Sequence, residues 1–426
     1  DGSYFVVGSK EELKTLAVEG WDEFDRHSPH RPWIDKVKIC HPETGLIGER
    51  ILDVGNPWLD AGIVPFSTIK YNSDRDYWEK WFPGDFVTEC FPGQFRNWFY
   101  SLLAMSTALE GKAPFKTLLG HALVKDENGR DMHKSWGNAI WFDDAAEEMG
   151  VDVIRWMYAS QNVEHHLLFG YGPAKEVRRK LITLWNVYSF FATYASVDGF
   201  EPGKLTLKSA NLTLLDKWIL SKINVLIEEM DSHLNSFKLD RGMRKIERFL
   251  EDLSNWYVRR NRKRFWKTED DLDKQIAYQT LYEVLESLIK ICASIIPFVT
   301  DAIYQNLISN SDSSLPESVH LCDYPKSDSD FIDYELMEKM DVLKKVVELG
   351  RNARNKANLK IRQPLASLVF HIPKKENCNF ILDNHNVISD ELNVKSIRKA
   401  KSEGEIIEWN VKPNLKIVGQ KLGNRL

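Results

Sequence analysis

The sequence contains few cysteines, and their spacing excludes two kinds of framework. Five cysteines occur in 426 residues, and no two of them form a C-x-x-C pair. Their positions suit neither a zinc site nor a set of disulfide bonds. We therefore predict reduced thiols, a cytoplasmic protein and no protein-bound metal.

Other features are missing as well. There is no signal peptide, and the longest apolar run, around "IKICASIIPFV", is too short to span a bilayer, so we expect no membrane partner. No G-x-x-x-x-G-K-[ST] phosphate loop occurs. The net charge is −5, so a nucleic acid would have to meet a local basic face. The chain does not begin with Met, and we expect a fragment of a longer protein.

What is present indicates several domains with large cores, because 43% of the residues are apolar and 12% are aromatic. Residues 1–50 alternate short β-like runs such as "YFVVG" with the helical piece "SKEELKTLA", which Ser9 caps together with Glu12. Residues 51–165 are typical of an α/β segment. Within it, "FVTECF" predicts a buried strand, and "NWFYSLLAMSTAL" and "DDAAEEMGVDVIRWMYAS" predict helices.

The pattern in residues 166–345 is helical. Three segments carry apolar residues at i, i+3 and i+4, which favours a helix bundle. Residues 346–426 mix strand-like runs ("SLVFHI", "LKIVG") with a short helix, which predicts a small α+β domain. The fold class is therefore multidomain: α/β, then all-α, then α+β.

One lysine stands out in "NGRDMHKSWGNAIWF", residues 128–142. Lys134 lies between His133 and Ser135, in a loop that separates the α/β segment from a helix. A lysine is a compact charge on a flexible stem, and such a cation can stabilise charge on phosphate oxygens. The neighbouring side chains can add hydrogen bonds. The alternative is a solvated loop lysine.

The stretch "DMHKSWGN" resembles the K-M-S-K-S-[LI]-G-N signature loop of the class I aminoacyl-tRNA synthetases. Asp131 replaces the first lysine of that signature, and His133 replaces its first serine. The resemblance implies that loop 131–135 is catalytic and that Lys134 contacts ATP phosphates, assisted by His133 and Ser135, with Met132 also at the ATP. The positions that match are Met132, Lys134, Ser135, Gly137 and Asn138.

The preceding segment, "GDFVTECFPGQFRNWF", resembles the D-F-[IV]-x-E-G-x-D-Q-x-R-G-W-F run of isoleucyl members of the family. Pro92-Gly93 stands where the family has an Asp. The resemblance implies that Glu89 and Gln94 hold the aminoacyl-adenylate, that Trp98 lines the amino-acid pocket and that His121 lies near ATP. Read alone, Glu89 could be a solvated carboxylate and Trp98 a core aromatic.

Some family motifs are absent. "HSPH" at 27–30 has proline where the H-x-G-H motif has glycine, and the Thr-rich editing motif is missing. "DRHSPHRPWIDKV" resembles the return from the editing insertion. The resemblance implies four parts: the end of that insertion (1–50), the second half of a Rossmann-type catalytic domain (51–165), an anticodon-binding helical bundle (166–345) and a truncated α+β domain (346–426). We expect this fragment alone to be inactive.

Cations and aromatics interleave in "SNWYVRRNRKRFWK", residues 254–267. That combination suits RNA phosphates and unpaired bases, although a solvated helix face is the alternative. The surrounding helices resemble the synthetase anticodon-binding bundle. "LGRNARNKANLKIRQPL" (349–365), "DELNVKSIRKA" and "VKPNLKIVGQKLG" resemble isoleucyl members in particular. The predicted tRNA-binding residues are Arg259, Arg260, Arg262, Lys263, Arg264 and Trp266.

The resemblance implies an enzyme that activates isoleucine with ATP and Mg²⁺ and transfers it to tRNA(Ile), acting as a monomer. Two alternatives stay open. Asp131 and Pro92-Gly93 motivate a paralogue that binds tRNA and has lost catalysis. The third possibility is a ligase of the valyl or leucyl type.

Overall fold

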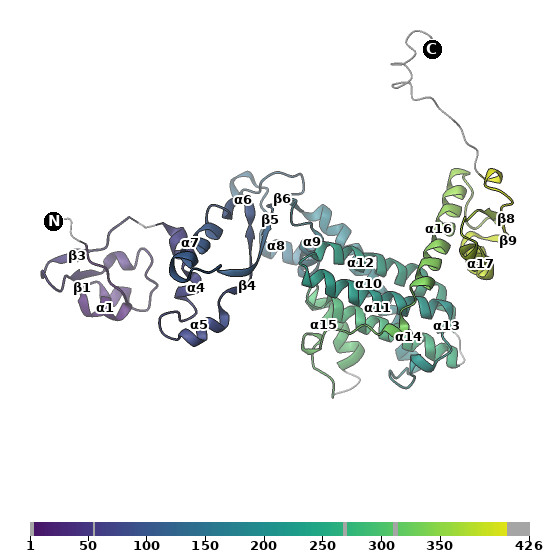
Figure 1. Cartoon of the computed structure of the whole chain (residues 1–426), viewed down its shortest axis with the longest axis horizontal. Coiled ribbons are helices and arrows are strands. Elements are labelled where there is room, and N and C mark those ends of the chain that lie inside the picture. The colour runs from purple at the N-terminus through teal and green to yellow at the C-terminus, as the bar shows by residue number, and fades with distance from the viewer. Residues whose placement is uncertain (1–3, 54–55, 267–270, 310–313, 407–426) are drawn as a thin grey trace, which may run out of the picture. The chain divides into compact units, whose positions relative to one another are not determined.

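The computed structural model describes residues 4–53, 56–266, 271–309 and 314–406 (Figure 1). The chain divides into two compact units. The first consists of residues 1–123 and 163–165, and the second of residues 124–162 and 166–426. The four-part division expected from the sequence stays a prediction.

The first unit begins with a short helix and a small antiparallel sheet of order β1-β2-β3. The helix is capped as predicted, because Ser9 Oγ accepts from the Glu12 N–H at 3.0 Å. The prediction of a strand at "YFVVG" was wrong. The Gly8 N–H donates to the Glu12 carboxylate at 2.6 Å, so it serves the helix cap. The elements are α1 (Lys10–Leu16), β1 (Ala17–Glu19), α2 (Trp21–Phe24), β2 (Lys38–Cys40) and β3 (Ile47–Glu49).

The rest of this unit holds two parallel strands with helices around them. A small core forms where Phe66, Trp78 and Phe82 pack together. The strand predicted at "FVTECF" and the helix predicted at "NWFYSLLAMSTAL" are both present, although the strand is half-exposed. Bounds are α3 (Pro57–Gly62), α4 (Val64–Ser67), α5 (Arg75–Trp81), β4 (Gly84–Cys90), α6 (Phe91–Gln94), α7 (Trp98–Glu110) and β5 (Phe115–His121).

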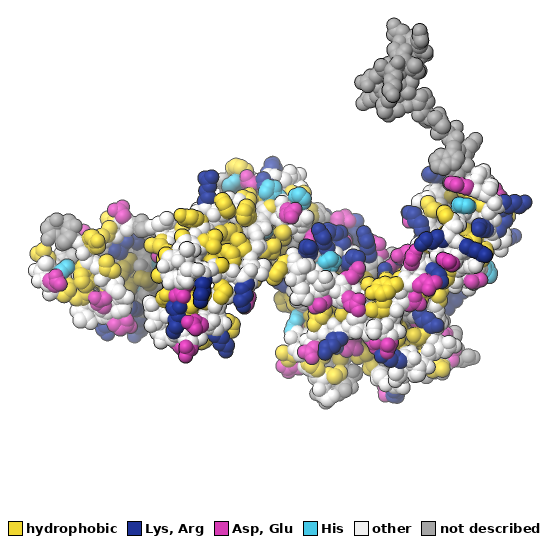
Figure 2. All heavy atoms as spheres, viewed as in Figure 1, with side chains coloured by type: hydrophobic (Ala, Val, Ile, Leu, Met, Phe, Trp, Pro, Cys, Tyr) yellow, Lys and Arg dark blue, Asp and Glu magenta, His cyan; other side chains and the backbone are white. Residues whose placement is uncertain are grey.

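Many apolar side chains around β4, α6 and α7 remain exposed, and Figure 2 shows them as a broad yellow area. Parallel strands are normally covered on both faces, so this two-stranded sheet is unusually open. The exposed side chains include Phe86, Phe91, Phe95, Tyr100 and Leu103.

The second unit starts with a short parallel strand pair and two helices. The sequence predicted one helix over "DDAAEEMGVDVIRWMYAS", and this was wrong. Gly150 adopts a φ of +89° and separates α8 from α9, because a residue at positive φ cannot continue a right-handed helix. Bounds are β6 (Val124–Asp126), α8 (Phe142–Met149), α9 (Val151–Ser160) and β7 (Leu167–Phe169).

A helix bundle forms the body of this unit, as predicted (Figure 1). Its core is rich in aromatic side chains, and Trp156, Trp218, Tyr257 and Tyr278 are all fully buried. A π-helix over Leu253–Val258 joins α12 to α13. Bounds are α10 (Tyr171–Asp198), α11 (Leu214–Asn235), α12 (Leu239–Asp252), α13 (Arg259–Trp266), α14 (Leu272–Cys292), α15 (Pro297–Tyr304) and α16 (Tyr334–Lys356).

The predicted α+β element follows α16 and consists of two parallel strands with two helices. The run "LKIVG" and the segment "VKPNLKIVGQKLG" lie outside the described residues. Bounds are β8 (Leu365–Phe370), α17 (Lys375–Asp383), α18 (His385–Leu392) and β9 (Val394–Lys399).

A buried arginine shapes the loop that joins α16 to β8. Arg354 is 5% exposed. Its guanidinium donates to four main-chain carbonyls, those of Lys360 (3.1 Å), Gln363 (3.0 Å), Leu392 (2.6 Å) and Asn393 (3.1 Å). These bonds hold the loop of residues 357–364 against the α+β element.

No helix among the described residues is both long and apolar enough to cross a membrane.

Candidate functional site

Four of the predicted site residues gather near the carboxyl ends of β4 and β5. The two strands run parallel, with Glu89 opposite Gly120 and Cys90 opposite His121. In open α/β sheets, ligands bind in the crevice beyond the carboxyl ends of the strands. The strand geometry therefore brings Glu89 and His121 to the edge where a small-molecule ligand is expected.

Gln94 ends α6 and Trp98 begins α7, the two helices that follow β4. Gln94 Oε1 accepts from the Trp98 N–H at 3.2 Å, which caps the start of α7. The Trp98 indole donates to the Ala61 carbonyl at 3.0 Å. At Gly62 a side chain would lie 2.8 Å from the backbone of Ser101, so α3 and α7 pack closely. Trp98 is therefore held in a fixed, half-buried position.

Glu89 and His121 also have fixed orientations. Glu89 Oε1 accepts from the Cys90 N–H at 2.7 Å. The Nδ1 atom of His121 lies 2.8 Å from the Ala122 carbonyl, which can only accept. Nδ1 therefore carries a proton, and in the neutral ring Nε2 is the acceptor.

The loop around Lys134 lies in the second unit and is fastened at its base. Asp126 is 6% exposed and accepts from the backbone N–H groups of Asn128 (3.0 Å) and Arg130 (2.8 Å) and from the Asn138 amide (3.0 Å). These bonds, that from the Arg130 backbone first and that from Asn138 next, lower the pKa of Asp126 to about 2. Asn138 also donates to the Asp131 carbonyl at 2.8 Å, so it cross-links the loop.

Lys134 itself is exposed, and its ammonium lies 4.4 Å from the centre of the Trp141 ring. That distance is typical of a cation–π contact. Asp131 forms an ion pair with Lys125 at 3.3 Å. The family signature has a lysine at position 131, and here a neighbouring lysine neutralises the acid.

The other loop residues differ in burial. Met132 is half-buried and packs against the hydrophobic core of the second unit. His133 and Ser135 are exposed, and the His133 ring contacts the edge of Trp136 with 4.2 Å between ring centres. The structure thus keeps Lys134, His133 and Ser135 open to solvent on a loop of defined shape.

Three of the six residues predicted to bind tRNA form ion pairs within the protein. Arg264 is 9% exposed and lies 2.8 Å from Asp216, which is fully buried. The Tyr257 hydroxyl donates to the same carboxylate at 2.8 Å. Burial lowers the pKa of Arg264, but the hydrogen bond to Asp216 outweighs it and leaves that pKa raised, so the guanidinium stays charged.

Arg259 and Arg260 also form ion pairs within the protein. Both pair with Glu391 of α18, at 2.6 and 2.8 Å, and Arg351 of α16 pairs with the same carboxylate. Burial raises the pKa of Glu391, and the hydrogen bonds from Arg260 and Arg259 reverse this and leave it lowered. The Glu391 cluster therefore fastens the α+β element to the bundle.

The remaining predicted residues of this segment, Arg262, Lys263 and Trp266, are exposed. On the face of this unit that Figure 2 shows, cationic and acidic side chains are intermixed. The tRNA-binding prediction stays a prediction for all six residues, and these three are exposed and take part in neither of the ion-pair clusters described above.

Sequence reasoning missed the partners Asp216 and Glu391, which are distant along the chain. It also missed a cationic groove between α11 and α12, although four cations at spacings of three and four residues in "DRGMRKIERF" were a usable signal. Within the described residues, no group of three or more His, Cys, Asp or Glu is placed to hold a metal. All five cysteines are free.

Comparison with protein families defines the class. The family described as "tRNA synthetases class I (I, L, M and V)" matches residues 9–168, and the "Anticodon-binding domain of tRNA ligase" matches residues 216–369. The chain belongs to the class I aminoacyl-tRNA synthetase family.

The chain is also similar over nearly its whole length to individual enzymes of this class. The chain is 40% identical over 98% of its length to the isoleucine–tRNA ligase of Clostridium novyi, and 38% identical over 99% of its length to that of Thermus thermophilus. It spans 40% of the length of each of these relatives. Among solved structures, LeuRS of Agrobacterium radiobacter K84, in a ternary complex with tRNA and LeuAMS, resembles it in fold. The TM-score is 0.53, with 14% identity over 77% of this chain and 38% of that one.

Proposed function

We propose that the chain is part of an isoleucine–tRNA ligase that works as a monomer in the cytoplasm. The observation that carries this proposal is the identity of 40% over 98% of the chain to an enzyme of that name. The ligase activates isoleucine with ATP and Mg²⁺ to give isoleucyl-adenylate and pyrophosphate, and it then transfers the acyl group to tRNA(Ile). The four parts expected from the sequence (1–50, 51–165, 166–345 and 346–426) belong to this proposal.

Lys134 is the proposed phosphate-binding cation, with His133 and Ser135 as hydrogen-bonding partners. No side-chain nucleophile is needed, because positioning and charge stabilisation are sufficient for this chemistry. The support is that all three side chains are exposed on a loop fastened by Asp126. Met132 and His121 complete the proposed contacts with ATP.

Glu89 and Gln94 are the proposed adenylate-binding residues, and Trp98 is the proposed wall of the amino-acid pocket. Their support is the position near the carboxyl ends of two parallel strands. Pro92-Gly93 lies within α6, between Glu89 and Gln94.

Isoleucine-dependent exchange between ATP and pyrophosphate tests the activity. The chain is joined to the part of the Clostridium novyi ligase that it does not match, and valine and leucine serve as control substrates. We expect exchange with isoleucine and charging of tRNA(Ile) alone. Charging of the valine or leucine tRNA instead would identify a ligase of the valyl or leucyl type.

Asp131 favours one second candidate, a tRNA-binding protein without catalysis, because it replaces a cation of the signature loop with an acid, which pairs with Lys125 of β6. Absence of exchange in the joined protein, with tRNA still bound, would select this candidate.

The exposed face of α13 has its own test. Replacing Arg262 and Lys263 with Ala should weaken tRNA binding to the chain and reduce the salt slope by about two, or one for each phosphate contact. An unchanged slope would assign these residues to a solvated helix face.

A further inference from the structure

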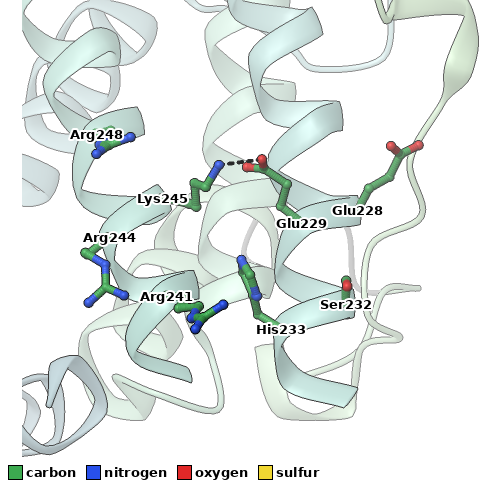
Figure 3. A pocket seen from close by; sticks show the side chains of 8 residues that line it. All are labelled: Glu228, Glu229, Ser232, His233, Arg241, Arg244, Lys245 and Arg248. Atoms are coloured by element: carbon green, nitrogen blue, oxygen red, sulfur yellow. Dashed lines mark hydrogen bonds and ion pairs between the residues drawn. The ribbon is translucent and has the colours of Figure 1, made fainter. Parts of the chain in front are cut away.

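A groove between α11 and α12 is separate from the basic segment described above (Figure 3). It is an open depression with a volume of about 530 Å³. One wall is the exposed face of α12, and the other is the C-terminal half of α11. The lining residues are Glu228, Glu229, Ser232, His233, Arg241, Arg244, Lys245 and Arg248.

The four cations of α12 form a row on one face of the helix. Arg241, Arg244, Lys245 and Arg248 occur at i, i+3, i+4 and i+7, so their side chains are neighbours. At 1.5 Å per residue the row is about 10 Å long. Like charges four residues apart destabilise a helix, and so does a cation in its first turn, where Arg241 lies. Helix stability therefore does not account for this row.

Two of these cations are balanced by acids, and two are not. Arg244 pairs with Asp240 at 2.9 Å, and Lys245 pairs with Glu229 at 2.6 Å. Within the described residues, neither Arg241 nor Arg248 has a carboxylate at ion-pair distance. Both are exposed, so two guanidinium groups remain available to an anionic partner.

The acids of α11 do not cancel these two charges. The charge of Glu229 is already neutralised by Lys245, as the dashed line in Figure 3 shows. Glu228 accepts from the Ser327 hydroxyl at 3.0 Å and points away from α12 (Figure 3). The groove therefore keeps a local positive charge although the chain as a whole is acidic.

The composition of the groove indicates what it can recognise. Phe, Tyr, Trp, Asn and Gln are absent from its lining, so His233 supplies its one aromatic ring and no side-chain amide is present to read base edges. Arginine suits phosphate, because its planar fork matches the phosphate oxygens. A surface of this kind contacts the RNA backbone independently of sequence.

The groove is also rigid. Gly242 lies where α12 meets α11, and a side chain there would come within 2.6 Å of the Met230 sulfur. Both helices belong to the large core, so the row of cations has a fixed position before any partner binds.

We propose that this groove binds the phosphate backbone of a base-paired stem of tRNA, with Arg241 and Arg248 making the direct contacts. The proposal rests on the proposed function, since it takes tRNA as the substrate. The groove is a second RNA-binding surface, which recognises charge and shape. It acts in addition to the exposed face of α13, which carries Trp266.

The test uses the 426-residue chain and measures binding of a tRNA(Ile) transcript over a series of salt concentrations. The variant R241Q/R248Q removes both unpaired charges. The matched control is K204Q/K326Q, which removes two exposed charges of the same unit outside the groove. Both variants should melt like the parent chain, because none of the four side chains is buried. A third variant, R241K/R248K, retains the charges.

We expect R241Q/R248Q to weaken binding about tenfold and to reduce the salt slope by about two, whereas the lysine variant keeps most of the slope and the control changes neither. With a transcript that has an altered anticodon, R241Q/R248Q should again bind about tenfold more weakly than the parent chain, because phosphate contacts do not depend on base identity.

Three results would overturn the proposal, and they are distinguishable. Unchanged tRNA binding in R241Q/R248Q would reject the groove and leave the proposed function intact. If tRNA binding is unchanged and an oligoglutamate peptide binds the parent chain but not R241Q/R248Q, the groove is a site for acidic peptides. Failure of the parent chain to bind any tRNA would reject the proposed function together with the groove.

Discussion

At the scale of single residues, Lys134 combines exposure with a defined resting position. Its ammonium lies over the Trp141 ring, from which a more strongly attracting anion can withdraw it. A triphosphate is such an anion. The loop base stays fixed by Asp126 and Asn138, so only the lysine side chain needs to move.

Replacing Lys134 with Ala in the joined ligase should cost about 3–4 kcal/mol of transition-state stabilisation, because it removes a cation placed for charge developing on phosphate. The measurement is kcat/KM for ATP–pyrophosphate exchange. Lys116→Ala is the control. Lys116 lies near the N-terminal end of β5, whereas His121 lies at its C-terminal end, and Lys116 pairs with Asp85. A decrease smaller than about tenfold would contradict the role assigned to Lys134.

The lowered pKa of Asp126 predicts a dependence on acid. A carboxyl group with a depressed folded-state pKa stabilises the protein fully above its unfolded value of 3.8, and this contribution is lost as the pH falls towards about 2. Asp126→Asn should therefore be less stable than the parent chain at pH 6, and the difference should shrink between pH 4 and pH 2. Urea unfolding across this range measures it. A constant difference would show that the carboxylate charge is not what fastens the loop.

At the scale of elements, α13 has two faces with different tasks. One face carries Arg264, which meets Asp216 of α11 inside the bundle. The other carries Arg262 and Lys263, which are exposed. A single basic helix thus both connects the bundle and presents charge to solvent.

Arg264→Ala should lower the free energy of unfolding by about 3–5 kcal/mol, because it leaves the Asp216 carboxylate buried without its cation. The exposed neighbour provides the comparison, and Arg262→Ala should change stability by less than about 0.5 kcal/mol. Equal effects of the two substitutions in urea unfolding would mean that the buried ion pair does not hold α13 to α11.

The sequence predicted these elements well where local chemistry decides them. The Ser9 cap, the apolar stripes of the bundle helices, and the strands β4 and β8 all depend on residues close together along the chain. Arg264 and Asp216 lie 48 positions apart, so no local pattern could show that one basic residue of the run is buried and another is exposed. The break at Gly150 was missed because a lone glycine is compatible with a helix until its φ is known.

At the scale of the whole chain, the two units differ in how much apolar surface they bury. Among the described residues, the buried core cluster of the first unit consists of Phe66, Trp78 and Phe82, whereas the second unit has one continuous core that runs from α8 to β9. Burial of apolar surface is the main source of folding free energy, so the units should differ in stability.

Hydrogen exchange should show this difference. Amides of β4, β5 and α7 should exchange faster than those of α11 and α14, because local opening costs least where few apolar groups are buried. The measurement is exchange followed by mass spectrometry on the intact chain at neutral pH. Equal protection of the two groups would mean that the open sheet is more stable than its burial indicates.

Arg354 holds the loop of residues 357–364 entirely through main-chain carbonyls, and every amino acid supplies a carbonyl. These two bonds therefore do not depend on which side chains stand at positions 360 and 363. Lys360 and Arg362 are exposed on this loop, which the Asn393 amide also holds through the Ile361 carbonyl at 3.1 Å. New side chains at positions 360 and 362 would therefore change the surface of the loop and leave the bonds from Arg354 in place.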